Sequence, residues 1–315
     1  MKRRLAIVLL ALVCVSSGAA ATSYEPLYPM VAPNGAQIAW VEGATWRIWI
    51  ANQDGSGAHA FGPSFKNAGM TQVAWTRHGM VVDSNFRLVL LSRDGKHLTT
   101  LSPAGFSFAF GGSRVASGPE RAPGTLVVAD LITHRTWRMG SPQVNNSGAA
   151  LSPDGTRVVW DGGDSLWTAR VGGKPKRLAL NGSCPQWSPD GRSIAYLSLP
   201  DDALLVKPSG GGGSKVLVAH AFTGCNVPGA PAWSPDSKSV AFERKNRLAI
   251  VDVASLRTLR STMPVTGGFT WAHDASSLVV ASRPASRERA GDNCTNLWRL
   301  DAQSLRGAIV VRGCP

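Results

Sequence analysis

The chain has 315 residues and a formal net charge of +13, from 33 lysine and arginine residues against 20 aspartate and glutamate residues. Three of the basic residues (Lys2, Arg3, Arg4) stand at the N-terminus, and without them 30 basic and 20 acidic residues leave a net charge of about +10. Beyond the N-terminal segment no stretch approaches the ~20 apolar residues of a membrane-spanning helix, which excludes a protein with further transmembrane helices.

Residues 1–21 have the three parts of a secretory signal peptide. A positively charged start is followed by the apolar run 5–15 and then by small residues, so cleavage would begin the mature chain near Thr22. A retained N-terminal membrane anchor is the alternative. We expect a secreted or periplasmic protein of a bacterial envelope, without a membrane span after cleavage. In that compartment we expect the positive charge to attract an acidic protein surface or an anionic envelope polymer as a partner, and not nucleic acid. The alternative is that the charge only keeps the protein soluble.

A repeat with a period of about 40 residues fills the rest of the chain. The first half of each copy contains a turn, which is Ser-Pro-Asp-Gly in the fourth and fifth copies, and a short β-branched or aromatic run. In chain order these halves are Val31–Val41, Val73–Asp83, Phe108–Gly118, Ala150–Asp161, Gln186–Leu197, Ala232–Glu243 and Thr270–Ser282. The second halves are alternating apolar runs with a hairpin: Arg47–Phe61, Arg87–Leu101, Thr125–Met139, Ser165–Ala179, Ala203–Val218, Arg247–Ser261 and Asn296–Val311. Equivalent turn residues lie 34 to 46 residues apart (Asn34, His78, Gly112, Asp154, Asp190, Asp236, Asp274).

Each copy predicts four short strands, because proline and glycine shape the turns and the runs between them are too short for helices. One such sheet cannot bury both of its faces, whereas sheets arranged radially in a closed ring can. We therefore predict an all-β fold, a single β-propeller domain over residues 22–315 with seven four-stranded blades. A six-bladed ring is the alternative, since the third and seventh copies are degenerate. A β-sandwich would fit the strands but not the repeat.

The repeat resembles that of TolB and related WD-like propellers. The W-S-P-D-G run at 187–191, the I-A-Y run at 194–196 and the L-W pair at 166–167 carry the resemblance best. TolB proteins have a small α/β domain before the propeller, for which this chain has no room. The resemblance implies a propeller fold and a role in binding envelope protein partners at one propeller face.

Long connections predict which face of the ring is functional. The longest run from His220 to Pro231, from Arg283 to Thr295 and from Gly118 to Gly124, and all belong to the face opposite the tight turns. Basic residues in or beside the connections of this face form a predicted binding rim for a carboxylate, phosphate or sulfate group: Arg121, Arg244, Lys245, Arg283, Arg287 and Arg289. The alternative is that they are solvated charges without a partner.

Four cysteines follow the signal segment, and their spacing matches no zinc site. In an oxidising compartment they predict two disulfides. Because the repeat brings neighbouring connections together, we predict the pairs Cys184–Cys225 and Cys294–Cys314.

No catalytic motif is present. The six histidines are scattered, and we predict no metal site and no cofactor. The turn aspartates are interpreted as caps of their turns, and Trp75, Trp187, Trp233 and Trp271 as packing residues. The sequence therefore favours a monomeric, non-enzymatic binding scaffold, with an extracellular lyase or hydrolase acting on a polysaccharide or peptide as the alternative.

Overall fold

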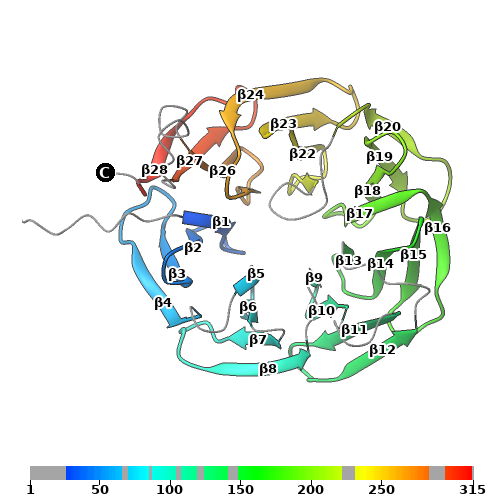
Figure 1. Ribbon diagram of the computed structural model, residues 1–315, viewed down its shortest axis with the longest axis horizontal. Coiled ribbons are helices and arrows are strands. Elements are labelled where there is room, and N and C mark those ends of the chain that lie inside the picture. The colour runs from blue at the N-terminus through cyan, green and yellow to red at the C-terminus, as the bar shows by residue number, and fades with distance from the viewer. Residues whose placement is uncertain are drawn as a thin grey trace, which may run out of the picture.

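The computed structural model describes residues 26–65, 70–84, 87–103, 108–118, 124–140, 148–221, 231–283 and 295–313. Within these ranges the chain forms seven four-stranded antiparallel sheets and no helix. Figure 1 shows the sheets as blades around a common axis, with the first strand of each blade innermost and the fourth at the perimeter. The protein is a seven-bladed β-propeller, so the predicted fold is confirmed and the six-bladed alternative is wrong.

The strands follow one another blade by blade. Blade 1 contains β1 (Pro26–Val31), β2 (Gln37–Glu42), β3 (Arg47–Asn52) and β4 (His59–Ser64), and blade 2 contains β5 (Met70–Thr76), β6 (Gly79–Ser84), β7 (Arg87–Leu91) and β8 (Leu98–Pro103). Blade 3 contains β9 (Phe108–Gly111), β10 (Arg114–Ser117), β11 (Thr125–Asp130) and β12 (Thr136–Gly140), and blade 4 contains β13 (Ala149–Leu151), β14 (Arg157–Gly162), β15 (Ser165–Arg170) and β16 (Lys176–Leu180). Blade 5 contains β17 (Gly182–Trp187), β18 (Ser193–Ser198), β19 (Ala203–Pro208) and β20 (Lys215–Val218). Blade 6 contains β21 (Ala232–Trp233), β22 (Ser239–Arg244), β23 (Arg247–Asp252) and β24 (Thr258–Pro264), and blade 7 contains β25 (Phe269–Trp271), β26 (Ser277–Ser282), β27 (Asn296–Asp301) and β28 (Gly307–Val311).

Side-chain hydrogen bonds shape the turn between the first two strands of a blade. In blade 4 the Ser152 hydroxyl donates to the Asp154 carboxylate at 2.6 Å, and the same carboxylate accepts the backbone N–H of Thr156 at 3.0 Å. Gly155 then takes a left-handed φ of 70°, which glycine adopts without strain. The serine-to-aspartate bond recurs at 2.6 Å in the next two blades, from Ser188 to Asp190 and from Ser234 to Asp236. The interpretation of these aspartates as turn caps therefore agrees with the structure.

Asp130 caps the hairpin between the third and fourth strands of blade 3. Its carboxylate accepts the backbone N–H groups of Ile132 and Thr133 and the Ser113 hydroxyl, each at 3.0 Å, and pairs with the Arg114 guanidinium at 3.5 Å. Burial alone would raise the pKa of Asp130. The hydrogen bonds from Thr133, Ile132 and Ser113 outweigh that effect and lower the pKa from 3.8 to about 2.

We expect the variant Asp130→Asn to be less sensitive to acid than the wild type. A carboxyl whose pKa is lower in the folded chain stabilises the fold above its unfolded-state pKa, and this stabilisation is lost as the pH falls through the folded-state pKa. Between pH 5 and pH 2 the wild type should lose about 2 kcal/mol more unfolding free energy than Asp130→Asn. Urea unfolding at each pH measures this, with the exposed Asp201→Asn as a control that follows the wild type. Parallel curves for wild type and Asp130→Asn would contradict it.

The apolar core lies between neighbouring blades. One cluster joins Leu126 and Val128 of blade 3 to Val158 and Trp160 of blade 4, and all four side chains are fully buried. Tryptophans at the ends of first strands also tie adjacent blades by hydrogen bonds. Trp233 of blade 6 donates from Nε1 to the Gln186 carbonyl of blade 5 at 3.1 Å, and Trp271 of blade 7 donates to the Ala232 carbonyl of blade 6 at 3.0 Å. These tryptophans are packing residues, as interpreted from the repeat.

Blades 7 and 1 close the ring by packing and not by strand exchange. The four strands of each of these blades are consecutive in sequence, so neither blade borrows a strand from the other chain end. β1 lies against β25 and β26, and Figure 1 shows β1 beside β26. The Tyr28 backbone N–H donates to the Gly267 carbonyl at 2.7 Å. A shared apolar cluster includes Ile38 and Trp40 of blade 1 and Val279 of blade 7. Closure in the described part of the chain therefore depends on side-chain and turn contacts.

Candidate functional site

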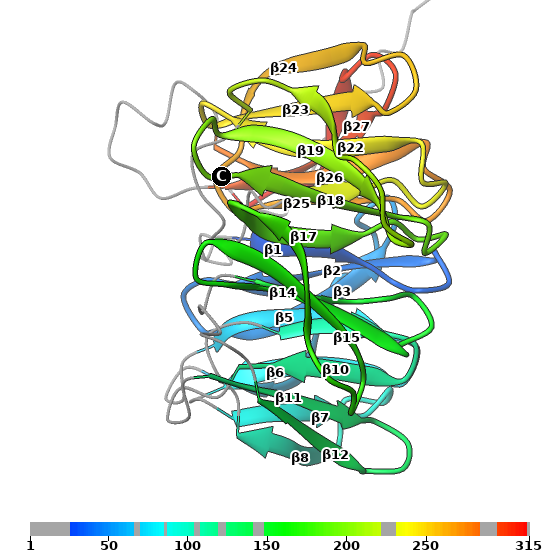
Figure 2. The ribbon, with the colours of Figure 1, turned by 90° about the vertical axis from the view of Figure 1, so that its right-hand side faces the viewer.

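The two faces of the ring differ in the connections they carry. One face holds the turns between first and second strands and between third and fourth strands, and we call it the turn face. The other holds the connections between second and third strands and between blades, and we call it the long-loop face. Because every blade has the same antiparallel strand order, equivalent strand ends lie on the same face. Figure 2 shows the ring from the side, with the described hairpins of the turn face gathered on the right.

Three of the predicted rim cations lie in the described residues, and all three are on the long-loop face. Arg244 ends β22, Lys245 follows it in the turn of blade 6, and Arg283 follows the end of β26 in the adjacent blade 7. The structure thus brings the predicted residues of blades 6 and 7 to one side of the ring. The other predicted rim residues, Arg121, Arg287 and Arg289, lie outside the described residues.

The three cations differ in how available they are. Lys245 is exposed on a tight turn in which it and Asn246 have φ values of 52° and 59°, and Arg244 is half-buried beside it. Arg283 is half-buried, already has an interaction partner, and is not a free cation. The neighbouring Arg247 is also engaged, since its guanidinium donates to the Thr262 carbonyl. Arg244 and Lys245 are therefore the described residues that best fit the predicted rim.

Carboxylates near the same face were not singled out by the sequence. Asp83, Asp161 and Glu243 occupy one equivalent position near the ends of their second strands, opposite a buried leucine of the third strand in each case. Asp83 and Asp161 are 1% and 2% exposed. Glu243 is half-buried, and burial raises its pKa. Aligning the ends of the first repeat halves could have revealed this shared position.

The acidic residues of this face that the structure describes do not form a group that could hold a metal ion. Glu42 of blade 1 is also buried, but its carboxylate accepts the backbone N–H groups of Ala44 and Thr45, both at 2.8 Å, and so caps its own turn. Asp83, Asp161 and Glu243 belong to blades 2, 4 and 6, which are not neighbours. In the described ranges no group of three histidine, cysteine, aspartate or glutamate side chains could hold a metal ion.

Cys184 lies in the first strand of blade 5. It is 2% exposed and disulfide-bonded. Cys225, Cys294 and Cys314 are outside the described residues. The pairings Cys184–Cys225 and Cys294–Cys314 therefore stay predictions.

The fold and its two faces define the class of protein, a seven-bladed β-propeller with exposed cations on its long-loop face. In the part of the chain that the structure describes, no helix is long and apolar enough to cross a membrane. No protein-family model matches the sequence. Comparison with curated proteins also finds no match.

Solved structures with the same fold are numerous. TolB from Acinetobacter baumannii is similar with a TM-score of 0.52 and 18% identity, over 78% of this chain and 65% of that chain. Hydrazine synthase from Kuenenia stuttgartiensis has a TM-score of 0.65 and 11% identity, over 92% and 99% of the two chains. A puromycin-hydrolysing peptidase from Mycobacterium tuberculosis has a TM-score of 0.61 and 16% identity, over 94% of this chain and 55% of the peptidase. At such identities the likeness shows the fold alone, which is a β-propeller.

Proposed function

We propose that the protein is an exported, non-enzymatic binding scaffold that recognises a protein or an anionic cell-envelope polymer through its long-loop face. The observation that carries this proposal is the pair Arg244 and Lys245, which stand at the edge of that face with no ion pair to any described residue. Desolvated pairs between such cations and carboxylates or phosphates of a partner are strong and directional. The fold shared with TolB supports a binding role, and the N-terminal signal-like segment supports export.

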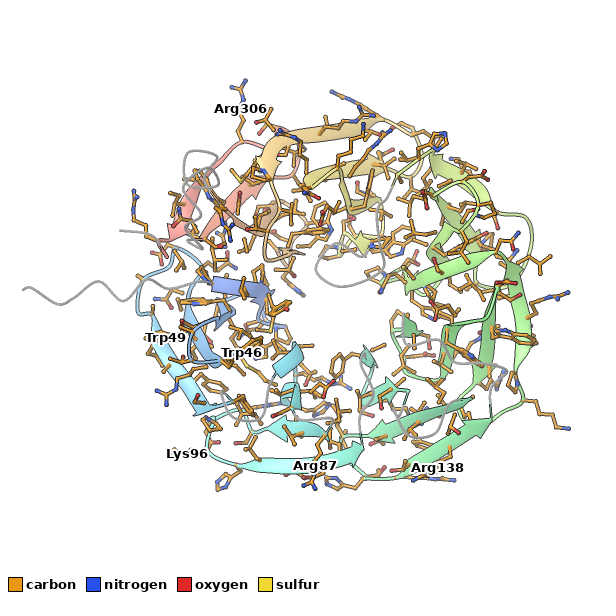
Figure 3. All side chains as sticks on the ribbon, in the orientation of Figure 1. Trp46, Trp49, Arg87, Lys96, Arg138 and Arg306 are labelled. Carbon is orange, nitrogen blue, oxygen red and sulfur yellow. The ribbon has the colours of Figure 1, made fainter. Side chains whose placement is uncertain are left out.

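A pull-down from envelope extract tests the proposal, with the immobilised protein beginning at Thr22. In the test variant alanine replaces four predicted rim cations, Arg244, Lys245, Arg287 and Arg289. In the control variant alanine replaces four exposed cations away from this face, Lys96, Arg138, Arg260 and Arg306. Figure 3 shows three of the control residues, Lys96, Arg138 and Arg306, at the outer perimeter of the ring. Arg283 is left unchanged because it is half-buried and has a partner.

We expect the rim variant to capture about tenfold less of the partner, and the control variant to capture about as much as the wild type. Both variants lose four positive charges, so the difference between them separates a defined site from general attraction. Equal capture by the rim variant and the wild type would contradict the proposal. Cleavage of an envelope polysaccharide or peptide by the wild type would favour the enzymatic alternative if the variant Glu243→Gln no longer cleaves it.

A further inference from the structure

A cationic groove lies on the turn face of blade 4. Its volume is about 390 Å³, and its walls come from the start of β14, the end of β15 and the hairpin that joins β15 to β16. Four of its seven lining residues are basic, and none is acidic: the lining consists of Arg157, Thr168, Ala169, Arg170, Gly173, Lys174 and Lys176. The groove therefore gathers four positive charges on the face opposite the proposed partner.

The strand register shows that this charge is peculiar to blade 4. In blade 3 the first residue of the second strand, Arg114, lies opposite the last residue of the third strand, Asp130, and the two form an ion pair at 3.5 Å. The same register position in blade 4 pairs Arg157 with Arg170. Like charges directly opposite each other on neighbouring strands are destabilising. Blade 4 thus places a second arginine where blade 3 has the carboxylate.

A second groove provides an internal comparison. It lies on the turn face between blades 6 and 7, and there the equivalent register position pairs Ser239 with Asp252. Its lining has two carboxylates, Asp236 and Asp252, beside two cations, Lys238 and Arg257. Both grooves adjoin the same register position on the turn face, but of the two only the blade 4 groove has an unbalanced positive charge.

The cations of the blade 4 groove have no carboxylate partner among the described residues. Neither of the ion pairs in the described chain involves them. Arg157 is half-buried, with its guanidinium 5.7 Å from the centre of the Trp187 ring, which holds it at the groove wall. The nearest turn carboxylate in sequence, Asp154, is engaged by the hydroxyls of Ser152 and Thr156 at 2.6 and 2.8 Å.

We propose that this groove binds a phosphate group carried by a small molecule or by a polymer. A phosphate monoester bears close to two negative charges and several acceptor oxygens, so it can engage two arginines and two lysines at once, which a single carboxylate cannot. Binding would also remove the repulsion between Arg157 and Arg170. The site is independent of the long-loop face, because the two lie on opposite sides of the ring.

Titration calorimetry at low ionic strength tests the proposal with three probes: inorganic phosphate, glycerol 3-phosphate and a poly(glycerol phosphate). The key variant is Arg170→Asp, which recreates in blade 4 the arginine–aspartate pair of blade 3. The matched control is Arg306→Asp, with the same change of charge in the equivalent hairpin of blade 7, on the same face. Lys174→Ala/Lys176→Ala provides a second test at two exposed positions, in case Arg170→Asp does not fold.

We expect saturable binding of at least one probe, with Kd raised about tenfold or more in Arg170→Asp and in the double lysine variant, and nearly unchanged in Arg306→Asp. Tight binding of the polymer alone would assign the site to a polymeric phosphodiester, and binding of the monoester or free phosphate would assign it to a small molecule. Three results would overturn the proposal: no saturable binding by the wild type, undiminished binding by Arg170→Asp, or equal weakening in Arg306→Asp.

Discussion

Replacing Trp160 with alanine is expected to lower the free energy of unfolding by about 3 to 5 kcal/mol. Among the described residues Trp160 is the largest of the fully buried side chains, with 0% exposure, and it lies in the cluster between blades 3 and 4. Removing the indole leaves a cavity against Leu126 and Val128 of blade 3. The strands of two blades border this cavity, and neither sheet can close it without shifting against the other. Urea unfolding followed by tryptophan fluorescence measures the change.

The opposite residue in the register provides the control. Trp167 lies directly across from Trp160 on the third strand, but it is half-buried, and its Nε1 donates to the Gly162 carbonyl at 3.2 Å. Trp167→Ala removes the same side chain and should cost about half as much or less. Trp160→Phe keeps much of the side-chain volume and should also lower the free energy of unfolding by less than Trp160→Ala does. Trp167 packs against the same cluster from its partly exposed edge, so equal losses at positions 160 and 167 would mean that the degree of burial does not set the cost.

The second large effect is expected at the closure of the ring, from Gly55→Ala. Gly55 lies in the hairpin between β3 and β4 at a φ of 86°, and a Cβ atom there would lie 1.8 Å from the Val310 carbonyl oxygen in β28 of blade 7. The clash is with backbone, so no side-chain rotation relieves it, and blades 1 and 7 must separate. We expect a loss of about 2 to 4 kcal/mol in the free energy of unfolding.

Gly57→Ala separates the clash from the cost of the left-handed backbone. Gly57 stands in the same hairpin at a φ of 66°, and a Cβ there would meet only the Asn52 side chain, at an ordinary 3.5 Å. This variant should lose about 1 kcal/mol. Hydrogen exchange should show earlier opening of β1 and β28 in Gly55→Ala but not in Gly57→Ala. If the two variants are equally stable, closure does not depend on the approach of Gly55 to blade 7.

The repeat predicted the blades well because its information is local. The Ser-Pro-Asp-Gly turn at 152–155 needs only its own residues, since Ser152 and Asp154 bond to each other and Gly155 takes up the left-handed φ. The alternation of apolar residues in the following runs then determines which side chains face the neighbouring blades. The shared position of Trp187, Trp233 and Trp271 likewise indicated a packing role before any contact was known.

The candidate sites depended on contacts that the repeat does not encode. Arg283 and Lys245 are both cations at the end of a second strand, and the sequence does not distinguish them. In the structure Arg283 is half-buried and has a partner, whereas Lys245 is exposed. The opposition of Arg157 and Arg170 becomes visible only when the strand register aligns them with Arg114 and Asp130 of the preceding blade. Sequence interpretation placed the binding surface on the long-loop face and missed the grooves of the turn face, because short turns gave no sign that a cavity opens beside them.

The sequence by itself determined the strands, the turns and the all-β ring, since each of these follows from periodicity and turn chemistry within about forty residues. The tertiary structure decided the number of blades, the closure of the ring without strand exchange, and the charge balance of each groove. The physical reason is the distance along the sequence between the residues that make each contact. A turn is stabilised by neighbours in the chain, whereas closure joins Gly55 to Val310, and a groove takes its charge from strands that meet only when the blade has formed.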